Sequence, residues 1–207
     1  MFDPIETIDY KSCTIEIYMD DDADDPRNWD NLGHMTCFHN RYSLGDSHNY
    51  NNLVELSETI NDKNSIILPL YLYDHSGITI NTTGFSCPWD SGQVGIIYMT
   101  KEEIRKEYNW KVITKNRREK IYEYLINEVK IYDDFLTGNV YGFMTKDKCG
   151  DDIESCWGFF GETDYMINEA KGEVDYYLDQ KRKEHFKQVK TWIKNSVPLY
   201  ARKVIEI

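Results

Sequence analysis

The sequence predicts one α+β domain, with a mostly antiparallel or mixed sheet of about five to seven strands packed by two or three longer helices. Short β-branched and aromatic runs are bounded by Gly, Pro, Asn and Ser clusters, which is typical of strands and turns. The helical periodicities do not alternate regularly with these runs, which favours α+β over βαβ order. At 207 residues the chain is long enough for one substantial core.

The first half of the chain is rich in predicted strands. Residues 14–19 alternate as TIEIYM, and residues 34–39 form a second short run. The longest apolar runs, 66–73 and 94–99, are expected to be central strands, with 78–81 as a short strand between them. Polar loops follow the first central strand and precede the second, and such loops on a rigid scaffold often carry functional groups.

The sequence also predicts helices between these strands and after them. Leu53, Leu56 and Ile60 predict a short helix over 52–60. Thr100 and Glu103 have the spacing of a capping box for a short helix that ends near Tyr108. The strongest helical pattern covers 115–136, where apolar residues recur at spacings of three and four and a glycine supplies the stop: Ile121, Leu125, Val129, Tyr132, Leu136 and Gly138.

The last third predicts a hairpin, a long helix and a short tail. Residues 140–145 and 155–160 form the hairpin strands. A helix begins at Thr163 and either ends in the polar stretch near 181–185 or extends into solvent, because the apolar period resumes before Pro198. The tail at 202–207 predicts a final strand. We therefore divide the chain into an acidic α+β domain, 1–180, and a helical extension and tail, 181–207, packed on the same domain.

The net charge of −12 lies entirely in the first half. Residues 1–34 hold ten acids against two bases, residues 35–100 hold six against two, and residues 101–207 hold twenty of each sign. Such a field repels nucleic acid and attracts basic partners. We expect no wrapping of DNA or RNA by the N-terminal half. The basic run from Lys181 to Lys190 is interpreted as a solvated helix face.

The five cysteines are odd in number and form no CxxC pair, which is typical of reduced thiols and predicts a cytoplasmic protein. No apolar run is long enough to cross a bilayer, and no signal peptide is evident at the N-terminus, so no membrane partner is expected. Nucleotide-binding signatures are missing, and we predict no cofactor. Cys37 and His39, with Asp46 or His48, are metal-ligand types. Without zinc-finger spacing, no metal is predicted, and Cys37 is equally a small buried hydrophobe.

Three loops carry the candidate site residues. Asp74 and His75 follow one central strand, Asp90 precedes the other, and His39 follows 34–38; these four are the catalytic candidates if the protein is an enzyme. Adjacent residues on an extended chain point apart, so Asp74 and His75 form no dyad with each other, and an Asx-type turn is the competing interpretation. The binding candidates are the aspartates of the acidic loop together with one cation and one aromatic: Asp20, Asp21, Asp22, Asp24, Asp25, Arg41 and Trp89.

Several motifs together resemble a known family. They are NWDNLG from Asn28, LPLYLYDHSGIT from Leu68, CPWDSGQVG from Cys87, LTGNVYGF from Leu136 and SCWGFFG from Ser155. They are similar to acidic proteins of unknown chemistry encoded by phages, plasmids and conjugative elements of low-GC Gram-positive bacteria. The resemblance spans residues 11–180 and implies an anti-defence factor of the anti-CRISPR or antirestriction type, acting in the host cytoplasm.

Three functions follow as hypotheses. In the first, the acidic half binds and inhibits a host defence protein through that protein's basic nucleic-acid-binding surface. In the second, the Asp and His cluster makes the protein a hydrolase or nuclease acting on RNA or DNA. In the third, the chain is a phage structural or regulatory protein whose loops serve folding or assembly.

Overall fold

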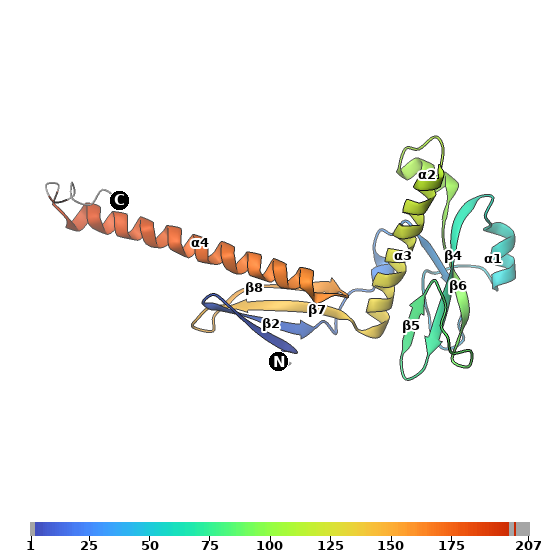
Figure 1. Ribbon diagram of the computed structural model, residues 1–207, viewed down its shortest axis with the longest axis horizontal. Helices are drawn as coiled ribbons and strands as arrows, with labels where there is room; N and C mark the ends of the chain where they lie inside the picture. The colour runs from blue at the N-terminus through green and yellow to red at the C-terminus, as the bar shows by residue number, and fades with distance from the viewer. Residues whose placement is uncertain (1–2, 199–200, 202–207) are drawn as a thin grey trace. The chain divides into compact units, whose positions relative to one another are not determined.

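The computed structural model describes residues 3–198 and residue 201, and it confirms the α+β class (Figure 1). The chain divides into two compact units, each with its own four-stranded antiparallel sheet. The middle unit comprises residues 20–140, and the terminal unit combines residues up to Met19 with those from Tyr141 onward. The predicted tail strand at 202–207 lies outside the described residues, and the proposed boundary at residue 180 stays a prediction.

The expectation of one sheet with five to seven strands was wrong, because the described residues form eight strands in two sheets. The strand over residues 14–19 does not join those of the middle of the chain. It pairs instead with an N-terminal strand and with the C-terminal hairpin. Alternation along a strand specifies which face is buried, but it does not specify the partner strand. The sequence pattern therefore left the number of sheets open.

In the terminal unit the sheet order is β1 (Glu6–Tyr10), β2 (Cys13–Met19), β7 (Val140–Lys146) and β8 (Asp152–Phe160). The analysis of the sequence missed β1, which is exposed along most of its length and so lacks a clear apolar alternation. Helix α4 (Thr163–Ser196) covers one face of the sheet. Its Met166, Ala170 and Val174 pack on Ile15, Ile17, Phe143 and Cys13 to form the core of this unit.

In the middle unit the order is β3 (His34–Cys37), β6 (Ser91–Thr100), β4 (Ser65–Asp74) and β5 (Ile78–Asn81). Helix α3 (Lys115–Thr137) packs on one face, and the short helix α1 (Leu53–Thr59) packs on the other (Figure 1). The predicted apolar positions of α3 from Ile121 to Tyr132 are all buried. Gly138, at φ 73°, ends the helix in the left-handed region, as its sequence position predicted.

Helix α2 (Lys101–Glu107) confirms the predicted capping box. The Thr100 hydroxyl accepts from the backbone N–H of Glu103 at 3.2 Å, and the Glu103 carboxylate accepts from the backbone N–H of Thr100 at 2.9 Å. Burial raises the pKa of Glu103, but the bond from the Thr100 hydroxyl at 2.6 Å, the 2.8 Å contact with His34 and the bond from the Thr100 N–H outweigh it and hold that pKa below its usual value. The capping box therefore fixes the backbone at the junction between β6 and α2.

The close approach of β3 and β6 depends on Gly95. A Cβ atom at this position would lie 2.0 Å from the carbonyl oxygen of Thr36 and 2.9 Å from the Cα of Cys37, both in the backbone of β3. Backbone atoms cannot move aside as a flexible side chain can. Because β3 leads into the loop that carries several candidate site residues, Gly95 also positions that loop.

We therefore expect Gly95→Ala to lower the free energy of unfolding by about 1–3 kcal/mol through overpacking, as measured by urea denaturation. Gly92→Ala on the same strand is the matched control, because nothing lies within 4 Å of a Cβ built there. Equal stability of the two variants would show that β3 does not need this close approach.

Candidate functional site

A buried arginine organises the end of the middle unit that carries the candidate residues. The Arg27 side chain is only 4% exposed, although it follows five aspartates in the sequence. Its Nε and Nη2 donate to the two carboxylate oxygens of Asp46, each at 2.8 Å, in a bidentate pair. Nη1 donates to Glu128 of α3 at 3.0 Å, and Nη2 also donates to the carbonyl of Gly33 at 2.7 Å.

The two carboxylates of this cluster are themselves held by backbone donors. Glu128 Oε1 accepts from the N–H groups of Leu32 and Gly33 at 3.1 and 3.0 Å. Asp46 Oδ2 accepts from the N–H of Met35 at 2.7 Å. Burial opposes the charge of Arg27, but the hydrogen bonds and charges of Asp46 and Glu128 outweigh it and raise the pKa of the guanidinium. The ion cluster therefore stays charged and joins the segments on either side of β3 to α3.

This cluster is not among the residues predicted from the sequence, although the sequence holds signals for it. Glu128 lies next to Val129 on the stripe of α3 that was predicted to be buried, and an acid in that place needs a partner. Arg27 is one of two bases among the first 34 residues. The pairing of these two residues with Asp46 spans about a hundred positions, so no local pattern indicates it.

The acidic loop, residues 20–25, leads into this anchored arginine. Asp21, Asp22 and Asp24 are exposed. Asp25 instead caps the 3-10 turn η1 (Pro26–Asn28), where its carboxylate accepts from the backbone N–H of Arg27 at 2.8 Å. At its other end, the N–H of Asp20 donates to the carbonyl of Val140 at 2.8 Å. Both ends of the loop are hydrogen-bonded, so its exposed carboxylates are presented from an ordered backbone.

The structure brings the two polar loops of the central strands together. The N–H of Asp74 donates to the carbonyl of Asp90 at 2.8 Å. His75 Nδ1 lies 3.2 Å from Asp90 Oδ2, so the carboxylate that orients this ring comes from the neighbouring loop and not from Asp74. The thiol of Cys87 lies 3.8 Å from the same Asp90 oxygen.

Asp74 is paired differently. It forms an ion pair with Arg41, and the Tyr42 hydroxyl reaches its other carboxylate oxygen at 3.5 Å. His39 stacks on Tyr42 with ring centroids 5.1 Å apart, and its Nδ1 accepts from the N–H groups of Arg41 and Tyr42 at 3.3 Å. A shallow hollow of about 310 Å³ is lined by five of the predicted residues: His39, Arg41, Asp74, Trp89 and Asp90.

These side chains are open to solvent. The His75 side chain is 63% exposed and that of Arg41 is 65% exposed, while Trp89 is 91% exposed. Exposed charges interact weakly in water, and this hollow lacks the burial by which enzymes usually shift the pKa of a catalytic group. The arrangement is better suited to contact with another macromolecule, in which Trp89 would supply apolar area and Arg41 a directed charge.

The possible metal ligands near β3 are committed to other interactions. Burial raises the pKa of the Cys37 thiol to about 12, so it stays protonated, and His48 Nε2 bonds the Cys37 carbonyl at 2.9 Å. Asp46 is engaged by Arg27 and by Met35. Within residues 3–198 and 201, no group of three or more His, Cys, Asp or Glu side chains is placed to hold a metal ion.

Comparison with known proteins adds no relative, since no family model, curated protein or solved structure matches the chain. The resemblance seen in the motifs therefore stays a prediction. Among the described helices, none is long and apolar enough to cross a membrane.

The ion cluster leads to a stability prediction. Arg27→Met leaves Glu128 and Asp46 without their cation, and removal of one member of a buried ion pair costs about 3–5 kcal/mol. We expect that loss in the free energy of unfolding, measured by urea denaturation.

Arg41→Met is the matched control, because it breaks an exposed pair with Asp74 and should cost less than about 1 kcal/mol. Similar losses for the two variants would mean that the buried cluster does not hold the unit together.

Proposed function

We propose that this chain is an interaction protein that binds the basic nucleic-acid-binding surface of another protein through its acidic loop. The observation that carries the proposal is the exposure of Asp21, Asp22 and Asp24 on a loop whose ends are hydrogen-bonded and which leads into the buried Arg27. Carboxylates presented in this way offer a basic groove the charges that it otherwise takes from phosphates.

The net charge of the middle unit also favours binding to a basic surface. Residues 20–100 of the middle unit hold twelve acids against Arg27, Arg41 and Lys63, which is −9. Complementary fields speed association and fix which surfaces meet, and they act over about 8 Å at physiological ionic strength. Exposed aromatic side chains of the same unit, Trp29 and Trp89, supply the apolar contact area that charge alone does not.

With the motif resemblance, this mode of binding favours inhibition of a host defence effector, of the anti-CRISPR or antirestriction type. Such effectors hold nucleic acid in positively charged channels, and an acidic protein that occupies the channel excludes the natural ligand. The proposal places the protein in the cytoplasm of the host cell, where these effectors act.

The first test replaces Asp21, Asp22 and Asp24 with Asn and measures binding to a panel of purified RNA-guided nucleases and restriction endonucleases. For a nuclease that binds the wild type, we expect affinity to fall about tenfold or more at low salt, because each lost contact contributes up to about 1 kcal/mol. The difference in affinity between wild type and variant should decrease at higher salt, because salt screens the charge interactions that the variant lacks.

The matched control changes Glu102, Glu107 and Glu123 to Gln, which alters net charge equally on α2 and α3. Equal weakening by both triple variants would point to overall charge instead of the acidic loop. Wild-type affinity in the Asp variant, or no binding to any of the nucleases, would contradict the proposal.

A second function is favoured by one contact, the 3.2 Å approach of His75 Nδ1 to Asp90. A carboxylate that orients an imidazole and stabilises its charged form is the usual support of a general base. In this alternative the protein hydrolyses RNA or DNA, with His75 as the base and Asp90 as its orienting partner. Asp74 and His39 line the hollow that Asp90 also lines.

Incubation with labelled RNA and DNA, with and without divalent metal, tests this alternative. If the protein is a nuclease, His75→Ala should remove cleavage, while His185→Ala on the exposed part of α4 should leave it intact. An absence of turnover by the wild type under all conditions would exclude the nuclease.

A further inference from the structure

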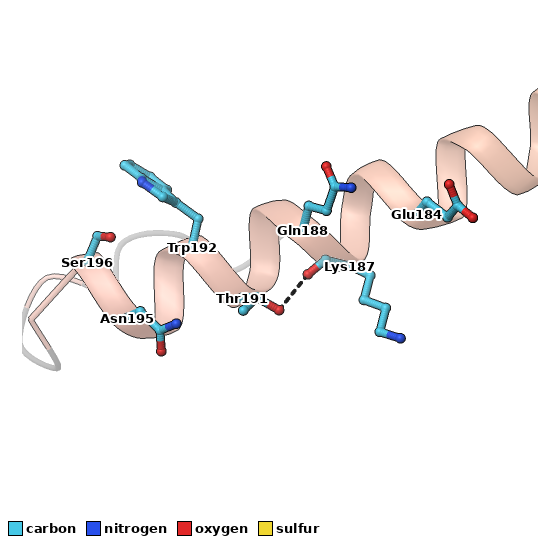
Figure 2. Close-up of a pocket in the computed structure, with 7 residues that line it drawn as sticks. All are labelled: Glu184, Lys187, Gln188, Thr191, Trp192, Asn195 and Ser196. Atoms are coloured by element: carbon cyan, nitrogen blue, oxygen red, sulfur yellow. Dashed lines mark hydrogen bonds between the residues drawn. The ribbon is translucent and has the colours of Figure 1, made fainter.

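Beyond Leu178, α4 contributes no residue to the described core of its unit, and Arg182 and Lys183 form ion pairs with Asp179 of the same helix. The residues of α4 that pack on the sheet end at Leu178, and every residue from Lys181 to Trp192 is exposed. We name residues 181–196 the basic arm. They hold six basic residues against Glu184, which is +5. Figure 2 shows Trp192 projecting from the helix near its end.

The arm has the pattern of a docking helix. Its exposed apolar side chains include Phe186, Val189 and Trp192, at 56%, 36% and 63% exposure. Phe186, Val189 and Ile193 recur at spacings of three and four, so they share one face. A second stripe lies beside them at the same helical spacing and is formed entirely by lysine: Lys183, Lys187, Lys190 and Lys194. By helical rise, this row is about 16 Å long.

This apolar face needs a partner. The arm continues a helix whose first part is packed on the sheet, and most helical stability in proteins comes from packing of an apolar face. Single exposed hydrophobic residues need no explanation, but Phe186, Val189 and Ile193 on one face, with Trp192 one turn from Val189, mark an interaction surface. Because a row of lysines lies beside this face, a negatively charged partner is favoured.

Pairing of two arms is disfavoured by the same lysines. If Phe186 and Ile193 occupy equivalent core positions of a helix pair, Lys183 and Lys190 flank that core at equivalent positions. In an antiparallel pair these flanking lysines of one arm face those of the other, and like charges in these positions oppose association. The lysine row therefore favours an acidic partner over a second arm in that orientation.

We propose that the basic arm docks on the acidic first half of a second copy of this chain, so that copies associate head to tail. The chain supplies both complementary surfaces, +5 on the arm and −9 over residues 20–100, and the latter includes the exposed Asp21, Asp22 and Asp24. Because the two surfaces differ, successive contacts give rings or open chains, and a reciprocal exchange of two arms gives a closed two-fold dimer.

Sedimentation velocity of the full chain over a range of concentrations tests this. At about 50 mM NaCl we expect the average mass to rise above 24.5 kDa with concentration, and at about 500 mM NaCl we expect it to return toward one copy. A single copy at every concentration and both salts would overturn the proposal.

Two charge-reversal variants identify the surfaces. The first changes Lys183, Lys187, Lys190 and Lys194 to Glu, which has a similar helix propensity, and the second changes Asp21, Asp22 and Asp24 to Lys. The first variant carries negative charge on both surfaces, and the second reduces the charge of residues 20–100 from −9 to −3 and reverses the exposed carboxylates of the acidic loop. Each alone should associate much less than the wild type, whereas an equimolar mixture should associate, because it pairs an unchanged arm with an unchanged first half. Failure of the mixture to associate would contradict the contact, provided that circular dichroism shows both variants folded.

A milder variant separates this contact from pairing between arms. Changing Asp21, Asp22 and Asp24 to Asn should weaken self-association at least severalfold, whereas pairing of two arms would be insensitive to this change.

The same sedimentation runs with a labelled single-stranded oligonucleotide test nucleic acid as the other possible anionic partner of the arm. Binding of the oligonucleotide by the arm without self-association would replace the proposal by nucleic-acid binding. Because only copies of this chain are needed, the result does not depend on whether a basic host partner exists.

Discussion

The middle unit depends on one buried guanidinium. Arg27 joins four segments at a single point: the turn that follows the acidic loop, the backbone that enters β3, the loop that carries Asp46, and helix α3 through Glu128. A buried ion cluster of this kind contributes little net stability compared with well-packed apolar residues, because desolvation offsets the attraction. What the cluster does is join these segments, because its three charges and the backbone donors bonded to them are all satisfied in this arrangement.

That constraint explains how a strongly repulsive stretch can be ordered. Five aspartates within six residues repel one another and favour extended, solvated chain. The loop is nevertheless fixed at Asp20 by the carbonyl of Val140 and at Asp25 by the N–H of Arg27. The carboxylates between these points are held close together and in water. For a binding surface this matters, because charges fixed before contact lose less entropy on binding.

The distribution of charge separates this chain from an ordinary acidic protein. The carboxylates of the first half surround very few bases, whereas the end of α4 carries a lysine row beside exposed aromatic side chains. One acidic surface can then serve a basic host protein or the basic arm of another copy. The two uses would compete, and self-association would set how much of the acidic surface is free. The exposed hollow lined by Asp74, Trp89 and Asp90 lies in the same unit as the acidic loop and is compatible with contact by a large partner.

The sequence by itself determined the local elements, because each depends on neighbouring residues. The stripe from Ile121 to Tyr132 and the stop at Gly138 specified α3, and Thr100 with Glu103 specified the start of α2. Grouping of Asp74, His75 and Asp90 was also predictable, since both loops adjoin paired central strands. Only the tertiary structure decided that the strands form two sheets, that Asp90 rather than Asp74 partners His75, and that Arg27 is buried against Glu128. These outcomes depend on contacts between residues far apart in the chain, which periodicity and spacing do not encode.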